Sequence, residues 1–255
     1  MSIHTQPWPP GVPCWADIQV RDVQAAQDFY SAVLGWSFTE PAEEFGGYVI
    51  AQVDGAAAAG IGPQMGGPAA WTLYLATDDA DKTAASIGEH GGTVVMPPGD
   101  VGASGRLAIA VDPTGAVFGL WQAGDHIGAG LVNAPGGVTW EDLRSPDPDT
   151  ARTFYAAVFG HEFAAVPGAP GDYTTFSLPG DAGPRGGIGP LMGQGTSPHW
   201  LTYFGVADAV AAAGAAQRAG GAVEVPDFET PFGRMAVITD PDGAVFWVVE
   251  ATGAP

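Results

Sequence analysis

The chain has 255 residues, 46% of them hydrophobic, which is enough for one large or two small cores. A formal net charge of −20, with only eight Lys and Arg residues, argues against a nucleic-acid partner, because that affinity depends on basic side chains that neutralise phosphates. We expect no membrane span, since no run of 18 apolar residues occurs. Residues 1–13 lack the features of a signal peptide, and the single cysteine, Cys14, excludes an intramolecular disulfide, so a cytoplasmic location is expected. The expected state is a monomer or a homodimer.

The first part of the chain predicts one compact module. Residues 1–11 are expected to form an irregular leader. Apolar and polar residues alternate from Trp15 to Val20, which predicts a strand with two different faces. Asp22 can cap the helix that follows and Gly35 can end it. Three more strands are expected at 36–39, at 48–53 and ending near 60–63.

The same order then begins again. A strand is expected at 71–76, a helix from Asp79 to Glu89, and a strand at 93–96 that stops before Pro97-Pro98. Two further strands, 107–111 and 116–122, flank Asp112-Pro113-Thr114-Gly115, which has the composition of a tight turn. Residues 124–136 are rich in Gly and Ala and are expected to be an interdomain linker.

The second half of the chain repeats the first. Trp15 and Asp17 return as Trp140 and Asp142 at the same spacing, each pair followed by a Phe-Tyr pair and a Gly. Further matching positions are Tyr48 and Tyr173, Trp71 and Trp200, Tyr74 and Tyr203, Arg106 and Arg234, and Asp112 and Asp240. The sequence therefore predicts an α+β protein of four strand–helix–three-strand modules, in domains at 12–123 and 137–252.

These motifs resemble the vicinal oxygen chelate superfamily, which includes glyoxalase I, bleomycin-resistance proteins, fosfomycin-resistance enzymes and extradiol dioxygenases. The tandem form is most similar to two-domain actinobacterial glyoxalase-like proteins. The resemblance implies a cupped sheet in each half, built from two modules. In the superfamily's enzymes the cup holds a divalent metal on His, Gln and Glu side chains. Whether modules pair within a half or between halves is left open by the sequence.

The positions that the resemblance assigns to metal ligands carry the wrong side chains. An indole N–H only donates hydrogen bonds, and glycine or aliphatic residues offer no ligand atom. We therefore expect no metal and no cofactor. The positions are Trp15, Trp140, Trp71 or Thr72, Trp200 or Leu201, Gly119, Trp247, 58–61 and 186–188.

Strand alternation predicts an aromatic cup lining instead. Such a lining suits a flat hydrophobic or aromatic small molecule stacked on indole rings. The expected ligand-binding residues are Trp15, Gln19, Tyr48, Trp71, Arg106, Trp121, Trp140, Arg144, Tyr173, Trp200, Phe204, Arg234 and Trp247.

Asp17 and Asp142 are the candidate catalytic residues. A carboxylate in an apolar cup loses hydration, so its pKa should rise toward the range of a general base. Alternatively, both aspartates satisfy backbone groups or pair with Arg144, Arg106 or Arg234. The two arginines Arg106 and Arg234 could gate the cup and hold an anionic or carbonyl group, or pair with nearby acids.

Three functions are compatible with these residues. The first is metal-free binding of a hydrophobic or aromatic small molecule. The second is a metal-free isomerase, cyclase or lyase that uses a cup aspartate as base. The third is a metal-dependent glyoxalase or dioxygenase. A non-catalytic antigen role is a further alternative.

Overall fold

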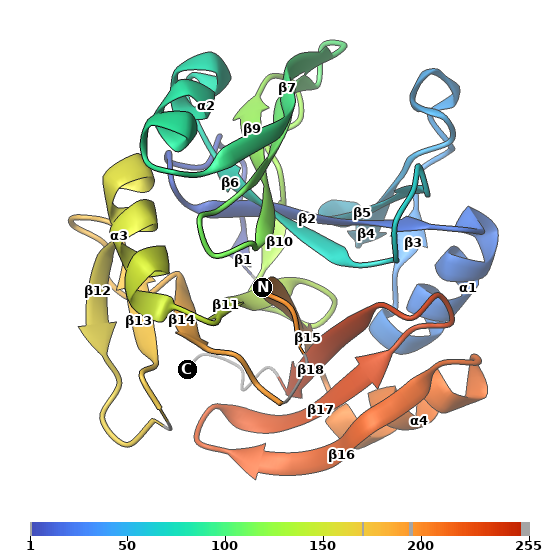
Figure 1. Ribbon diagram of the computed structural model, residues 1–255. Coiled ribbons are helices and arrows are strands. Elements are labelled where there is room, and N and C mark those ends of the chain that lie inside the picture. The colour runs from blue at the N-terminus through green and yellow to red at the C-terminus, as the bar shows by residue number, and fades with distance from the viewer. Residues whose placement is uncertain (1, 170, 194–195, 251–255) are drawn as a thin grey trace.

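A computed structural model of the protein describes residues 2–169, 171–193 and 196–250. Its two halves each form one mixed sheet (Figure 1). The first sheet has the order β3 (Ser37–Phe38), β4 (Val49–Val53), β5 (Ala56–Pro63), β2 (Pro13–Val20), β6 (Trp71–Ala76), β9 (Val117–Ala123), β8 (Gly105–Val111) and β7 (Thr93–Val101). The second has the order β12 (Glu162–Ala165), β13 (Thr174–Ser177), β14 (Gly186–Pro190), β11 (Val138–Ser145), β15 (His199–Val206), β18 (Val245–Glu250), β17 (Gly233–Thr239) and β16 (Ala222–Thr230).

The modules pair within each half. β2 lies antiparallel to β6 at the centre of the first sheet, and β11 lies antiparallel to β15 at the centre of the second. Each half is therefore a complete domain made of two neighbouring modules, which answers the question that the sequence leaves open.

Each α-helix begins after an aspartate whose side chain accepts a hydrogen bond from a backbone N–H three residues later. Gly35 and Gly160 end the first helix of each half in the left-handed conformation that favours glycine. The helices are α1 (Val23–Leu34), α2 (Ala80–Glu89), α3 (Pro148–Phe159) and α4 (Ala209–Arg218), with a 3₁₀ turn, η1, at Glu43–Phe45. Among the described residues, no helix is long and apolar enough to cross a membrane.

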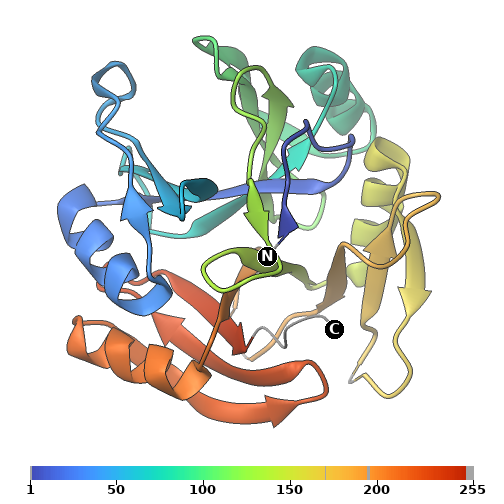
Figure 2. The ribbon, with the colours of Figure 1, turned by 180° about the vertical axis from the view of Figure 1, so that it is seen from behind.

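Helices of one half lie against helices of the other. α1 lies beside α4, and α2 lies beside α3, in both views (Figures 1 and 2). The Tyr30 hydroxyl of α1 donates to Asp240 at 2.9 Å, and the Tyr155 hydroxyl of α3 donates to Asp112 at 3.1 Å. Both acceptors open an Asp-Pro-x-Gly turn of the opposite half. The Phe-Tyr pairs and these turns therefore join the two domains.

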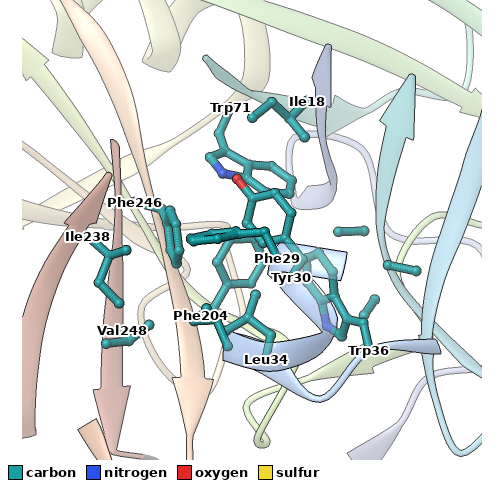
Figure 3. Packing of buried hydrophobic residues seen from close by; sticks show 14 of the residues in the cluster. Ile18, Phe29, Tyr30, Leu34, Trp36, Trp71, Phe204, Ile238, Phe246 and Val248 are labelled. Atoms are coloured by element: carbon teal, nitrogen blue, oxygen red, sulfur yellow. The ribbon is translucent and has the colours of Figure 1, made fainter. Parts of the chain in front are cut away.

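Two hydrophobic cores lie between the halves, and the larger one, beside α1 and α4, is shown in Figure 3. Ile18 and Tyr30 come from the first half, and Phe204 and Phe246 from the second. Phe204 packs edge-on against Trp71, with ring centroids 4.8 Å apart. One face of each central strand thus contributes to these cores, and the other face lines a concave surface that we call cup 1 in the first half and cup 2 in the second.

Two predicted boundaries differ from the structure. β7 continues through Pro97-Pro98 to Val101, because it is an edge strand that tolerates proline and has irregular register at this point. The leader and the linker, expected to be irregular, pair with each other through the two-residue strands β1 (Ser2–Ile3) and β10 (Leu131–Val132).

Candidate functional site

Strand register decides which side chains enter the cups. Trp15 lies opposite Tyr74, and Trp140 lies opposite Tyr203. Residues directly paired across a ladder share a face of the sheet. The tyrosines therefore join the tryptophans in the cups.

The prediction that Trp71, Trp200 and Phe204 line the cups is wrong. Each is an odd number of residues from the cup-facing tyrosine of its strand, so its side chain lies on the opposite face. Trp71 and Phe204 are part of the larger core between the halves (Figure 3). The Trp200 Nε1 donates to the Tyr155 hydroxyl at 3.1 Å in the core beside α3.

In cup 1, Asp17 is held by tyrosines. The hydroxyls of Tyr74 and Tyr48 both donate to its Oδ2, at 3.1 and 3.2 Å. The Trp15 Nε1 donates to the Tyr48 hydroxyl at 3.0 Å. Asp17 is only 8% exposed. The four residues form a hydrogen-bonded chain on the inner face.

Burial raises the pKa of the Asp17 carboxyl from 3.8 to about 7, while the hydrogen bonds from Tyr74 and Tyr48 act in the opposite direction. The tyrosines are affected in turn, since burial and the neighbouring Asp17 raise the pKa of both hydroxyls well above 10. Asp17 therefore exchanges its proton near neutral pH while both tyrosines stay protonated as donors.

Cup 2 repeats the arrangement but adds a cation. Asp142 Oδ1 accepts from Trp140 Nε1 at 2.8 Å and from the Tyr173 hydroxyl at 2.7 Å. Its Oδ2 accepts from the Tyr203 hydroxyl at 3.0 Å and from Arg144 Nη2 at 2.6 Å. The position of Arg144 is occupied in cup 1 by the half-buried Gln19. The two cups thus differ by one charge beside otherwise matching aspartates.

Glycines make room for the tyrosine rings. A Cβ at Gly60 would lie 1.7 Å from the Tyr48 hydroxyl, and one at Gly187 would lie 2.0 Å from the Tyr173 hydroxyl. A Cβ at Gly119 would lie 2.1 Å from the Tyr74 ring. The absence of side chains at these positions therefore lets the tyrosines lie flat on the sheet and reach the aspartates.

The two cups are covered to different extents. In cup 1 the His126 ring of the linker packs edge-on against Trp15, with centroids 4.5 Å apart, and its carbonyl accepts from Trp121 Nε1 at 2.8 Å. Trp15 and Trp121 are each 6% exposed. Burial lowers the pKa of His126 to about 4, so this ring is neutral at physiological pH. The tryptophans Trp140 and Trp247 of cup 2 are half-buried.

Arg106 and Arg234 pair with nearby acids, as the alternative prediction had it. Arg106 Nη1 lies 2.5 Å from Asp81 and its Nε 2.8 Å from Asp100. Arg234 Nη2 lies 2.5 Å from Glu229. Neither arginine has an ion pair with a cup aspartate among the described residues.

The side chains of the cups do not fit a catalytic divalent metal. Each inner face carries one carboxylate, and all four contacts of Asp142 are with hydrogen-bond donors. Within the described ranges, no group of three or more His, Cys, Asp or Glu side chains could hold a metal ion. The indole rings and glycines around the aspartates offer no side-chain ligand atoms, and the tyrosine hydroxyls already donate to the aspartates.

Two hollows lie beside the leader. One, of about 410 Å³, is bordered by Trp8, Trp140, Glu141 and Arg185. The other, of about 220 Å³, is bordered by Trp8, Ala76 and Trp121. The larger hollow therefore adjoins Trp140 of cup 2, and the smaller one adjoins Trp121 of cup 1.

Tyr74, Tyr203, His126 and Phe228 are not among the predicted site residues. Tyr74 and Tyr203 were recognised as repeated but were not predicted to touch the aspartates, although their spacing of three from Trp71 and Trp200 places them on the other face. The contribution of His126 depends on the path of the linker, for which the sequence contains no signal.

The Glyoxalase/Bleomycin resistance protein/Dioxygenase superfamily matches the chain twice, at residues 14–120 and 125–248. A Mycobacterium tuberculosis protein with the name "Putative glyoxylase CFP32" is 40% identical, over 94% of this chain and 95% of that protein. Anthracycline biosynthesis protein DnrV of Streptomyces peucetius is 38% identical, over 94% of each chain.

Solved structures share the fold at low sequence identity. The Mn(II)-bound glyoxalase from Novosphingobium aromaticivorans has a TM-score of 0.69 at 16% identity, over 95% of this chain and 82% of that one. The 2,3-dioxygenase LapB from Pseudomonas sp. KL28 has a TM-score of 0.66 at 17% identity, over 94% and 93%. With two matched domains and relatives of about this length, the chain belongs to the Glyoxalase/Bleomycin resistance protein/Dioxygenase superfamily.

Proposed function

We propose that the protein binds a flat aromatic small molecule in cup 2. The observation that carries this proposal is a partly exposed aromatic surface on the inner face of the second sheet. Trp140, Trp247 and Phe228 are all half-buried. The Trp247 ring lies 5.0 Å from the Tyr203 ring and 5.9 Å from that of Phe228. Clustered indole and phenyl rings with a few fixed polar groups are typical of sites for planar ligands.

Two further observations support the proposal. The 410 Å³ hollow beside the leader borders Trp140, one of the rings of that aromatic surface. Relatives from Streptomyces peucetius and Streptomyces sp. strain C5 have the name "Anthracycline biosynthesis protein" and are 38% and 36% identical. That name connects those proteins with the formation of a polycyclic aromatic compound, which is the class of ligand proposed here.

Binding of 2-ethylnaphthalene, measured by equilibrium dialysis, tests the proposal. Trp247→Leu should weaken binding about tenfold or more, because it removes one of the two indole rings of the inner face. The matched control is Phe45→Leu, a partly exposed ring of the first half, 37% exposed, which should leave binding unchanged. If the probe does not bind, or if the Trp247 variant binds it as tightly as the unaltered protein, cup 2 is not the site.

Asp17 supports a second candidate function, a metal-free isomerase, cyclase or lyase. Its carboxyl has a pKa of about 7 because of burial, and two tyrosine hydroxyls fix one of its oxygens. A group with this pKa can accept and return a proton at neutral pH. The candidate base is Asp17 rather than Asp142, since Asp142 is already paired with Arg144.

Proton transfer can be tested without the natural substrate. In D₂O, a general base promotes exchange of the methyl protons of 2-acetylnaphthalene, which NMR follows directly. The protein should accelerate this exchange, and Asp17→Asn should reduce the acceleration by tenfold or more. Asp142→Asn serves as the comparison at the equivalent position. Exchange that is equally fast in the Asp17 variant would remove Asp17 from the catalytic role.

A further inference from the structure

Arg144 has hydrogen-bond donors that the protein itself does not use. Its side chain is 11% exposed, and its Nη2 is bonded to Asp142 at 2.6 Å. The Nε is buried and has no hydrogen-bond partner among the described residues. The guanidinium carbon lies 5.4 Å from the centre of the Tyr173 ring, so the planar group rests against an aromatic wall of cup 2.

The fold does not need an arginine at this position. Cup 1 builds the same Trp–Asp–Tyr–Tyr arrangement around Asp17 with Gln19 in the equivalent place. Burying an N–H donor without an acceptor is costly. An arginine that is dispensable for the fold and incompletely bonded within it indicates an acceptor supplied from outside the chain.

The ligand group best suited to accept a hydrogen bond from Arg144 is a neutral oxygen. Asp142 already balances the charge of Arg144, so a carboxylate or phenolate brought to the guanidinium would also meet the negative charge of Asp142. The whole chain carries a net charge of −20, which disfavours an anion further. A carbonyl oxygen accepts a hydrogen bond from Arg144 without this repulsion.

We propose that the ligand of cup 2 is an aryl ketone or quinone whose carbonyl oxygen accepts a hydrogen bond from Arg144. This inference rests on the proposed binding of an aromatic molecule in the same cup and adds the functional group that the cup selects. The link to the stacking surface is continuous, because Asp142 holds both Arg144 and Tyr203, and Tyr203 contacts the Trp247 ring.

Three naphthalene probes test the inference by equilibrium dialysis. 2-Ethylnaphthalene offers the ring alone, 2-acetylnaphthalene adds a neutral carbonyl, and 2-naphthoate adds an anion. The unaltered protein should bind the acetyl compound about tenfold more tightly than the ethyl compound, since one charge-assisted hydrogen bond is gained. It should also bind the acetyl compound more tightly than the naphthoate.

Arg144→Gln copies the Gln19 of cup 1 and should therefore fold. In this variant the preference for the acetyl over the ethyl compound should disappear, while binding of the ethyl compound is retained. Equal binding of acetyl and ethyl compounds by the unaltered protein overturns the carbonyl inference and leaves the aromatic site standing. Tighter binding of the naphthoate overturns it in favour of an anion, and so does an acetyl preference that survives in the variant. If none of the three probes binds, the proposed function itself is wrong.

Discussion

Replacing Asp17 with asparagine should stabilise the protein, and more strongly at pH 8 than at pH 5. Burial raises the pKa of Asp17 from 3.8 to about 7 in the folded protein. Between these values the folded state holds a proton that the unfolded chain releases. The stability of the unaltered protein therefore falls as pH rises through this window, by about 1.4 kcal/mol per pH unit.

Asparagine keeps an acceptor oxygen for Tyr48 and Tyr74 but cannot ionise. The difference in unfolding free energy between the variant and the unaltered protein should therefore grow from pH 5 to pH 8, by about 2–3 kcal/mol. Guanidinium denaturation at both pH values measures it. Asp28→Asn, at an exposed position of α1, is the control and should change stability by less than about 0.5 kcal/mol at either pH. A difference for Asp17→Asn that does not vary with pH would contradict the burial argument.

A matched substitution tests why the pKa of Asp17 is raised. Gln19→Arg places beside Asp17 the cation that cup 2 already has at Arg144. A positive charge favours the ionised carboxylate, so the pKa of Asp17 should fall. The pH range over which stability falls should then end at a lower pH, and the total loss of stability should be smaller.

The fold could be predicted from sequence because its signals are local and repeated. Each helix start was marked by an aspartate such as Asp22 or Asp79, and the tandem Trp, Asp and Phe-Tyr spacings fixed the module order. A set of motifs that occurs twice in the same order and at the same spacing does not arise from chance alternation. Module pairing was undetermined, since the ladder between β2 and β6 joins residues that no short-range pattern connects.

The candidate site was only partly predictable, because it too depends on contacts between strands that no short-range pattern connects. Alternation showed that Trp71 and Tyr74 face opposite sides of their strand, but not which of them shares a face with Asp17. That choice depends on register, which is a long-range property. The hydrogen bonds of Tyr30 to Asp240 and of Tyr155 to Asp112 could not be predicted, because they cross between the halves.

Replacing Asp142 with alanine should destabilise the protein by about 3–5 kcal/mol, the largest loss that we expect from one substitution in the cups. Asp142 is the shared acceptor for Trp140, Arg144, Tyr173 and Tyr203. Its removal leaves a guanidinium that is 11% exposed without its counter-ion, together with hydroxyl and indole donors that lose their acceptor.

A comparison of asparagine variants at the two equivalent positions separates charge from packing. Asp17→Asn should stabilise the protein at pH 8, since it relieves a buried carboxylate. Asp142→Asn should destabilise it, because an amide cannot balance the charge of Arg144. Arg144→Gln introduced into Asp142→Asn should restore part of the loss, since the pair then has no uncompensated charge. Guanidinium denaturation of the unaltered protein, Asp142→Asn, Arg144→Gln and the double variant measures the coupling between positions 142 and 144. If Asp142→Asn proves as stabilising as Asp17→Asn, the ion pair is not what distinguishes cup 2 from cup 1.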